Sequence, residues 1–175
     1  LASYQQVEDA ISSGGLLIKM TNKETEKQYN ELKKKHKLPD FKELDFELEI
    51  SDMEETAFLL RGIIRRIAEK LDFYTTMIEE ELQPDTSKLY AMHESRIFEE
   101  EDKKKMFEFY KKLMILSRHS VEISLENNEK EEASFINGFM NEWEKIKSEL
   151  LFYVRKIKDS WKEETDTKED VGYLG

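Results

Sequence analysis

The chain has 175 residues, of which 38% are charged, no cysteine, and a formal net charge of −11 at pH 7. Without cysteine the chain has no disulfide, thiolate metal site or thiol nucleophile, and its acidic balance disfavours nucleic-acid binding through a cationic surface. Residues 1–19 lack the pattern of a secretory signal, and no apolar run approaches the roughly 20 residues of a membrane span. We therefore expect a cytoplasmic protein that does not bind membranes.

The first segment of the chain contains one predicted helix. Asn22 is a helix-capping residue type, and the basic run 33–37 suits the negative end of a helix dipole. A helix is therefore expected over 22–37. Residues 1–21 are expected to form a flexible N-terminal extension. Met20 resembles a start of translation, so two alternatives stay open for residues 1–19: they are native, or they are an upstream extension or non-native sequence.

The segment before the longest predicted helix carries two overlapping patterns. Residues 44–50 alternate strictly between apolar and polar, which indicates a strand, although Leu44 and Leu48 also share one face of a helix. A lone strand leaves its backbone groups unpaired. We expect a short helical turn after Pro39 and then an extended strap. Pairing of a strand with residues 16–20, or with a second copy of the chain, is the alternative.

The longest regular apolar pattern predicts a helix over residues 51–82. Ser51 and Glu54 have the spacing of a capping box, which marks a helix start, and Pro84 follows the expected end. Between them, apolar residues recur in steps of four and three, which places them on one helical face. This seam consists of Met53, Ala57, Leu60, Ile64, Ile67, Leu71, Tyr74 and Ile78.

Two further long helices are expected after the turn at 84–87. Helix resumes near Leu89 and breaks at 98–100, where acidic residues precede basic ones. The helix after that break is rich in apolar residues, and we expect it to be the most buried element. Asparagines 127–128 mark the next turn, and an apolar seam over 136–157 predicts the last helix.

These elements predict an all-α fold. Short connections make successive helices antiparallel neighbours, so we expect an antiparallel bundle of three long helices with an additional N-terminal helix and an extended strap. Residues 22–162 are expected to form a single helical-bundle domain. The polar residues 163–175 are typical of an acidic disordered tail.

No motif in the sequence commits to a catalytic chemistry. The three histidines lack the paired Glu-x-x-His or HExxH spacing of helical metal sites. All-helical nucleotide pyrophosphohydrolases bind magnesium through E-x-x-E and E-x-x-D patterns, for which Glu99, Glu100 and Asp102 are the candidate metal ligands. These acids also suit a helix start, where the dipole favours negative charge. We expect no cofactor.

A basic cluster is expected on the polar side of the predicted helix 51–82. Arg61 and Arg65 are one turn apart, as are Arg66 and Lys70, and such pairs repel unless acids neutralise them. We expect acids of the same molecule to neutralise them, with binding of an anion or an acidic partner as the alternative. Arg96 joins this basic cluster if the fold brings it near.

The apolar pattern favours a binding function over an enzymatic one. The apolar faces are wider than three helices need, and excess apolar surface marks an interface. We expect a non-enzymatic helical-bundle protein acting through protein–protein interaction or self-association, with a protein partner or as a homodimer. The alternatives are a Mg-dependent all-α nucleotide pyrophosphohydrolase, and anion or nucleic-acid binding through the basic cluster. The residues that widen the apolar faces are Leu59, Ile63, Phe107, Phe135 and Trp161.

Overall fold

A computed structural model describes residues 24–53 and 58–162. The predictions of an extension over 1–21 and a tail over 163–175 lie outside the described residues. The single domain over 22–162 stays a prediction, because contacts group the chain into two compact units. Unit 1 comprises Leu1–Leu71 and Leu116–Glu142, and unit 2 comprises Asp72–Ile115 and Trp143–Gly175.

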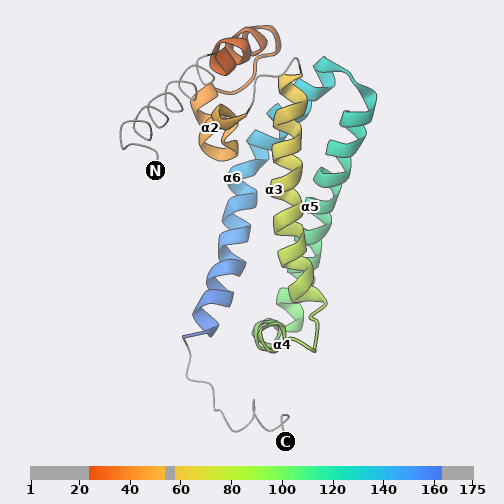
Figure 1. Ribbon diagram of the computed structural model, residues 1–175. Helices are drawn as coiled ribbons and strands as arrows, with labels where there is room; N and C mark the ends of the chain where they lie inside the picture. The colour runs from red at the N-terminus through yellow and green to blue at the C-terminus, as the bar shows by residue number, and fades with distance from the viewer. Residues whose placement is uncertain (1–23, 54–57, 163–175) are drawn as a thin grey trace, which may run out of the picture. The chain divides into compact units, whose positions relative to one another are not determined.

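Every regular element among the described residues is a helix, so the predicted all-α class is confirmed for that part of the chain (Figure 1). None of these described helices has the length and apolar character needed to cross a membrane. The elements are a helix over 24–36, α2 (Phe41–Leu48), the short 3-10 helix η1 (Ile50–Asp52), α3 (Leu59–Leu82), α4 (Leu89–Arg96), α5 (Glu100–Glu126) and α6 (Glu129–Ser160).

Three helix boundaries expected from the sequence are confirmed. α3 ends at Leu82, two residues before Pro84. The break between α4 and α5 covers residues 97–99. α5 and α6 are separated by 127–128, where Asn127 adopts a left-handed backbone with φ 53°, a conformation that asparagine tolerates better than most residues.

The expected extended strap is wrong, because α2 occupies most of it. Leu44 and Leu48, one helical turn apart, are both buried, whereas Phe46 between them is 84% exposed. The alternation over 44–50 therefore does not correspond to two faces of a strand. A helix pairs its own backbone groups, as in the bond from the Glu49 N–H to the Asp45 carbonyl, while a lone strand cannot.

The expected capping box at Ser51 does not start the long helix. Ser51 lies in η1, and its backbone N–H donates to Asp45 Oδ1 at 2.6 Å. Glu54 and Ala57 lie outside the described residues, and α3 is described from Leu59. Most of the predicted seam is nonetheless correct. The buried members within α3 are Leu60, Ile64, Ile67, Leu71 and Ile78.

The core of unit 1 joins the helix 24–36 and the α2–η1 segment to parts of the long helices. Tyr29 is fully buried; its hydroxyl donates to the Pro39 carbonyl at 3.0 Å, and its ring packs edge-on against Phe41. Met53 reaches Gly62 on α3. Leu59, Ile63 and Phe135, which were expected to widen an exposed apolar face, are all buried.

The core of unit 2 is aromatic. Trp143 on α6 is 1% exposed, and its ring centroid lies 6.2 Å from that of Tyr74 on α3. Tyr153, three turns further along α6, lies 5.8 Å from Phe109 on α5 and 6.0 Å from Phe98. Within unit 2, α6 therefore packs against both α3 and α5.

The expectation that α5 is the most buried helix is wrong. Its inward side chains are buried, but large apolar side chains also face solvent from the same helix. The apolar residues of α5 therefore lie on two sides of the helix. Among the described residues, one side is buried and the other is exposed to solvent. The buried ones are Met106, Phe109, Leu113 and Ile123, and the exposed ones are Phe107, Ile115, Val121 and Leu125.

Candidate functional site

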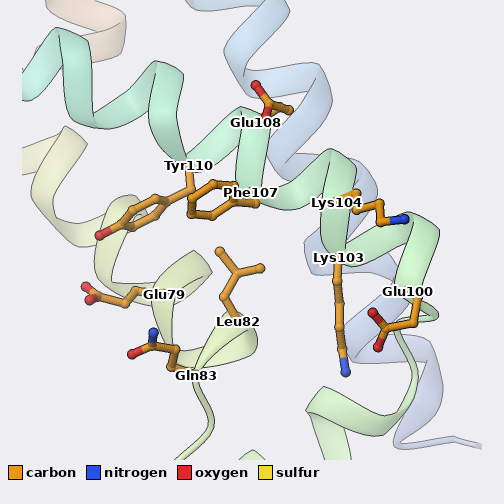
Figure 2. A pocket seen from close by; sticks show the side chains of 9 residues that line it. All are labelled: Glu79, Leu82, Gln83, Glu100, Lys103, Lys104, Phe107, Glu108 and Tyr110. Atoms are coloured by element: carbon orange, nitrogen blue, oxygen red, sulfur yellow. The ribbon is translucent and has the colours of Figure 1, made fainter.

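The candidate site is an open groove in unit 2, between the end of α3 and the first half of α5, with a volume of about 540 Å³ (Figure 2). We call it the α3–α5 groove. Its α3 side is formed where the helix ends before Pro84, and its α5 side begins at the first helical residue after the break. The lining residues are Glu79, Leu82, Gln83, Glu100, Lys103, Lys104, Phe107, Glu108 and Tyr110.

The floor of the groove is apolar. The rings of Phe107 and Tyr110 are stacked, with centroids 6.3 Å apart and planes inclined by 16°. Figure 2 shows the side chain of Leu82 pointing from α3 toward these rings. Phe107 is 50% exposed, so half of a large aromatic side chain is available for contact with another molecule.

The rim of the groove carries charges of both signs. Glu79 lies on the α3 side, while Glu100, Lys103, Lys104 and Glu108 lie on α5. None of the lining residues is a histidine, serine or threonine, so the groove lacks the hydroxyl–imidazole pair of many hydrolases. The groove therefore combines an apolar floor with a rim of mixed charge.

Two members of the basic cluster are neutralised within unit 1. Arg61 Nε donates to Glu132 Oε1 at 2.9 Å, and Glu132 is buried at the start of α6. Lys70 Nζ donates to the backbone carbonyl of Glu47 on α2 and lies 3.9 Å from its carboxylate. The expectation that acids of the same molecule pair with these residues is thus met for Arg61 and Lys70.

The remaining members of the basic cluster are not gathered in one unit. Arg65 is exposed and Arg66 half-buried on the part of α3 that belongs to unit 1. Arg96 is exposed on α4 in unit 2. No single unit therefore assembles the five basic residues into one binding surface.

The candidate metal ligands have other surroundings. Asp102 Oδ2 accepts a hydrogen bond from Lys156 on α6, and this bond lowers the pKa of Asp102. Glu100 lines the α3–α5 groove, and Glu99 lies just before α5. Among the residues that the structure describes, no three histidine, aspartate or glutamate side chains are placed to hold a metal ion.

Sequence reasoning identified Phe107 but missed Leu82 and Tyr110 as parts of one site. A signal for Tyr110 exists, because positions 107, 110 and 114 lie three and four residues apart and mark a second apolar stripe on α5. Leu82 carries no such signal, since its role depends on where α3 ends beside α5.

Comparisons of the chain with models of known protein families, with curated proteins and with solved structures found no match. The described residues form an all-helical fold whose unit 2 carries an open apolar groove with a rim of mixed charge.

Proposed function

We propose that this protein is a non-enzymatic helical protein that acts by binding protein through the α3–α5 groove, with a second copy of the chain as the occupant. The observation that carries the proposal is the half-exposed Phe107, stacked on Tyr110 and facing Leu82. Aromatic side chains of this kind are enriched among the residues that dominate the energy of protein interfaces.

The environment of Phe107 supports a protein occupant over a small polar one. The groove is open and its floor is a leucine and two aromatic rings, so most of the favourable free energy comes from removing apolar surface from water. Lys111 Nζ lies 5.5 Å above the Phe107 ring and pairs with Glu108 at 2.7 Å. These charges border the apolar floor, as the polar rim of an interface does.

The charge pattern supports a second copy as the occupant. A two-fold axis brings the same surface of both subunits together, so that surface must be complementary to itself. The groove meets this condition because its rim contains both acids, such as Glu79 and Glu100, and bases, such as Lys103 and Lys104. Each base of one copy then has acids of the other copy within reach.

The proposal includes the antiparallel three-helix bundle predicted from the sequence. Support comes from unit 2, where Tyr153 contacts Phe109 and Lys156 contacts Asp102. As residue numbers rise along α6 they fall along α5, which is the order expected of antiparallel neighbours.

Sedimentation velocity over a concentration series tests the proposal. The parent chain is expected to shift from monomer to dimer as concentration rises, and Phe107→Glu is expected to stay monomeric, because a carboxylate would be buried in the apolar interface. Phe152→Glu is the matched control: Phe152 is a phenylalanine of unit 2, 55% exposed, that does not line the groove. It is expected to associate like the parent.

Two results would contradict the proposal. If the parent is monomeric throughout the series, a second copy is not the occupant. If Phe107→Glu and Phe152→Glu associate equally, the groove is not the interface. Hydrolysis of nucleoside triphosphates with Mg²⁺ that is lost in Glu100→Gln would favour the hydrolase alternative, and salt-sensitive nucleic-acid binding lost in Arg65→Ala would favour the basic cluster.

A further inference from the structure

Glu81, at the end of α3, is a carboxyl group in surroundings that disfavour its charged form. The residue is 4% exposed, and its Oε2 atom has no hydrogen-bond partner among the described residues. An ionised carboxylate buried without donors is strongly unfavourable. Burial, followed by the nearby charge of Glu94, raises the pKa of Glu81 to about 7.

Glu94 on α4 lies close enough to Glu81 that its charge, and hydrogen bonding between the two side chains, both raise the pKa of Glu81. Such a bond needs a proton on one carboxyl group, because two carboxylates are both acceptors only. Glu94 Oε1 also accepts a hydrogen bond from Trp161 Nε1 at 2.7 Å. Trp161 directly follows α6, so one proton completes a chain of hydrogen bonds from α3 through α4 to the end of α6.

Two other ionisable groups lie near this chain of hydrogen bonds. Glu80, on the same helix as Glu81, adds negative charge. His93 on α4 stacks against Trp161 with ring centroids 4.4 Å apart, and its Nε2 atom is buried without a hydrogen-bond partner in the described chain. Because His93 is also an ionisable side chain next to Trp161, an experiment must separate its effect from that of Glu81.

We propose that Glu81 and Glu94 form a proton-dependent latch between α3 and α4, closed while the two carboxyl groups share one proton and open once that proton is lost. In the closed state Glu94 holds the indole of Trp161. Loss of the proton leaves two neighbouring carboxylates, one of them buried, and their repulsion separates α4 from α3. Trp161 then loses its acceptor. The latch lies outside the α3–α5 groove and does not depend on the proposed function.

Tryptophan fluorescence of the full chain between pH 5.5 and 8.5 tests the latch. The chain has two tryptophans, and Trp143 is buried and constant while Trp161 reports on Glu94. The emission of Trp161 is expected to change in a single-proton transition with its midpoint near 7. Trp161→Phe should remove the change. Glu81→Gln should also remove it, because the amide donates to Glu94 at every pH.

His93→Gln separates the effect of His93 from that of Glu81, and this variant is expected to retain the transition. The proposal is overturned if His93→Gln abolishes the transition while Glu81→Gln keeps it. A carboxyl-carbon NMR titration of the unaltered chain gives a readout that requires no variant. One glutamate resonance should titrate near pH 7, and finding every glutamate titrating below pH 6 would also overturn the latch.

Discussion

Met53 lies directly over Gly62: a Cβ atom placed at Gly62 would stand 2.2 Å from Met53 Cε. Gly62 is within α3 and has a normal helical backbone, so no unusual φ angle requires a glycine there. The missing side chain instead makes room for the methionine that follows η1. This contact attaches the α2–η1 segment to α3 within unit 1.

Gly138 provides the matched comparison, because a Cβ atom there meets no heavy atom within 4 Å. Replacing a glycine in a helix by alanine is worth about 1 kcal/mol. We expect Gly138→Ala to raise the free energy of unfolding by roughly that amount. Gly62→Ala should gain much less, because the buried Met53 side chain must move aside. Urea denaturation of both variants measures the difference.

A double variant tests whether the Met53 side chain is what limits the gain in stability from Gly62→Ala. In a Met53→Ala background the obstruction is absent, so adding Gly62→Ala should recover about 1 kcal/mol. An equal gain from Gly62→Ala with and without Met53 would show that the contact does not restrict this position.

The helices were predictable because their signals are local. The seam of α3 and the turn at Asn127 depend on residues a few positions apart, and both are present in the structure. The segment 44–50 was not predictable from its alternation, because whether Phe46 faces solvent depends on the elements around α2. Leu44 and Leu48 lie one helical turn apart and are both buried, which is the pattern of a helix rather than of a strand.

The candidate site was only partly predictable for a related physical reason. Phe107 was identified because the predicted helices carry more apolar residues than the core of a three-helix bundle needs, and Phe107 is one of them. The structure leaves its side chain half exposed. No pattern in the sequence distinguishes Glu81 from the other acids of the chain. Its burial against Glu94 requires the position of α4, which no pattern within α3 encodes.

Trp143 provides a direct test of the seam predicted for α6. It is 1% exposed and packs against Tyr74, so Trp143→Ala should cost about 3–5 kcal/mol by leaving a cavity. Trp161→Ala is the control, because that side chain is 53% exposed and should cost less than about 1 kcal/mol. Chemical denaturation followed by circular dichroism measures both. Equal losses would contradict the assigned core of unit 2.

Arg61 and Arg65 lie one turn apart on α3 but are expected to respond differently to mutation. Arg61 pairs with the buried Glu132, so Arg61→Met leaves a carboxylate without its counter-charge and should cost about 2 kcal/mol. Arg65 is exposed, and Arg65→Met should change stability by less than about 0.5 kcal/mol. Adding Glu132→Gln to Arg61→Met should restore part of the loss, as thermal denaturation would reveal. No recovery would show that the loss comes from packing of the arginine stem.

Glu81 predicts a pH dependence of stability opposite to that of the paired surface acids. Because the pKa of Glu81 is raised to about 7 in the folded state, the folded chain holds this proton where the unfolded chain, with an ordinary glutamate pKa of about 4.3, has lost it. The contribution to stability is therefore complete below about pH 4 and is lost as pH rises through 7.

Acids such as Asp102 and Glu129 have lowered pKa values, caused mainly by hydrogen bonds to Lys156 and Lys35 respectively. Their contributions are lost only as pH falls below the ordinary carboxyl range, so between pH 5 and 8 the Glu81 effect should dominate among the carboxyl groups. Glu81→Gln should remove this pH dependence. The stability of the variant minus that of the parent should therefore increase by up to roughly 3 kcal/mol between pH 5 and pH 8. Urea midpoints at the two pH values measure this change. If the stability difference between Glu81→Gln and the parent is the same at both pH values, Glu81 reaches solvent and ionises normally in the folded chain.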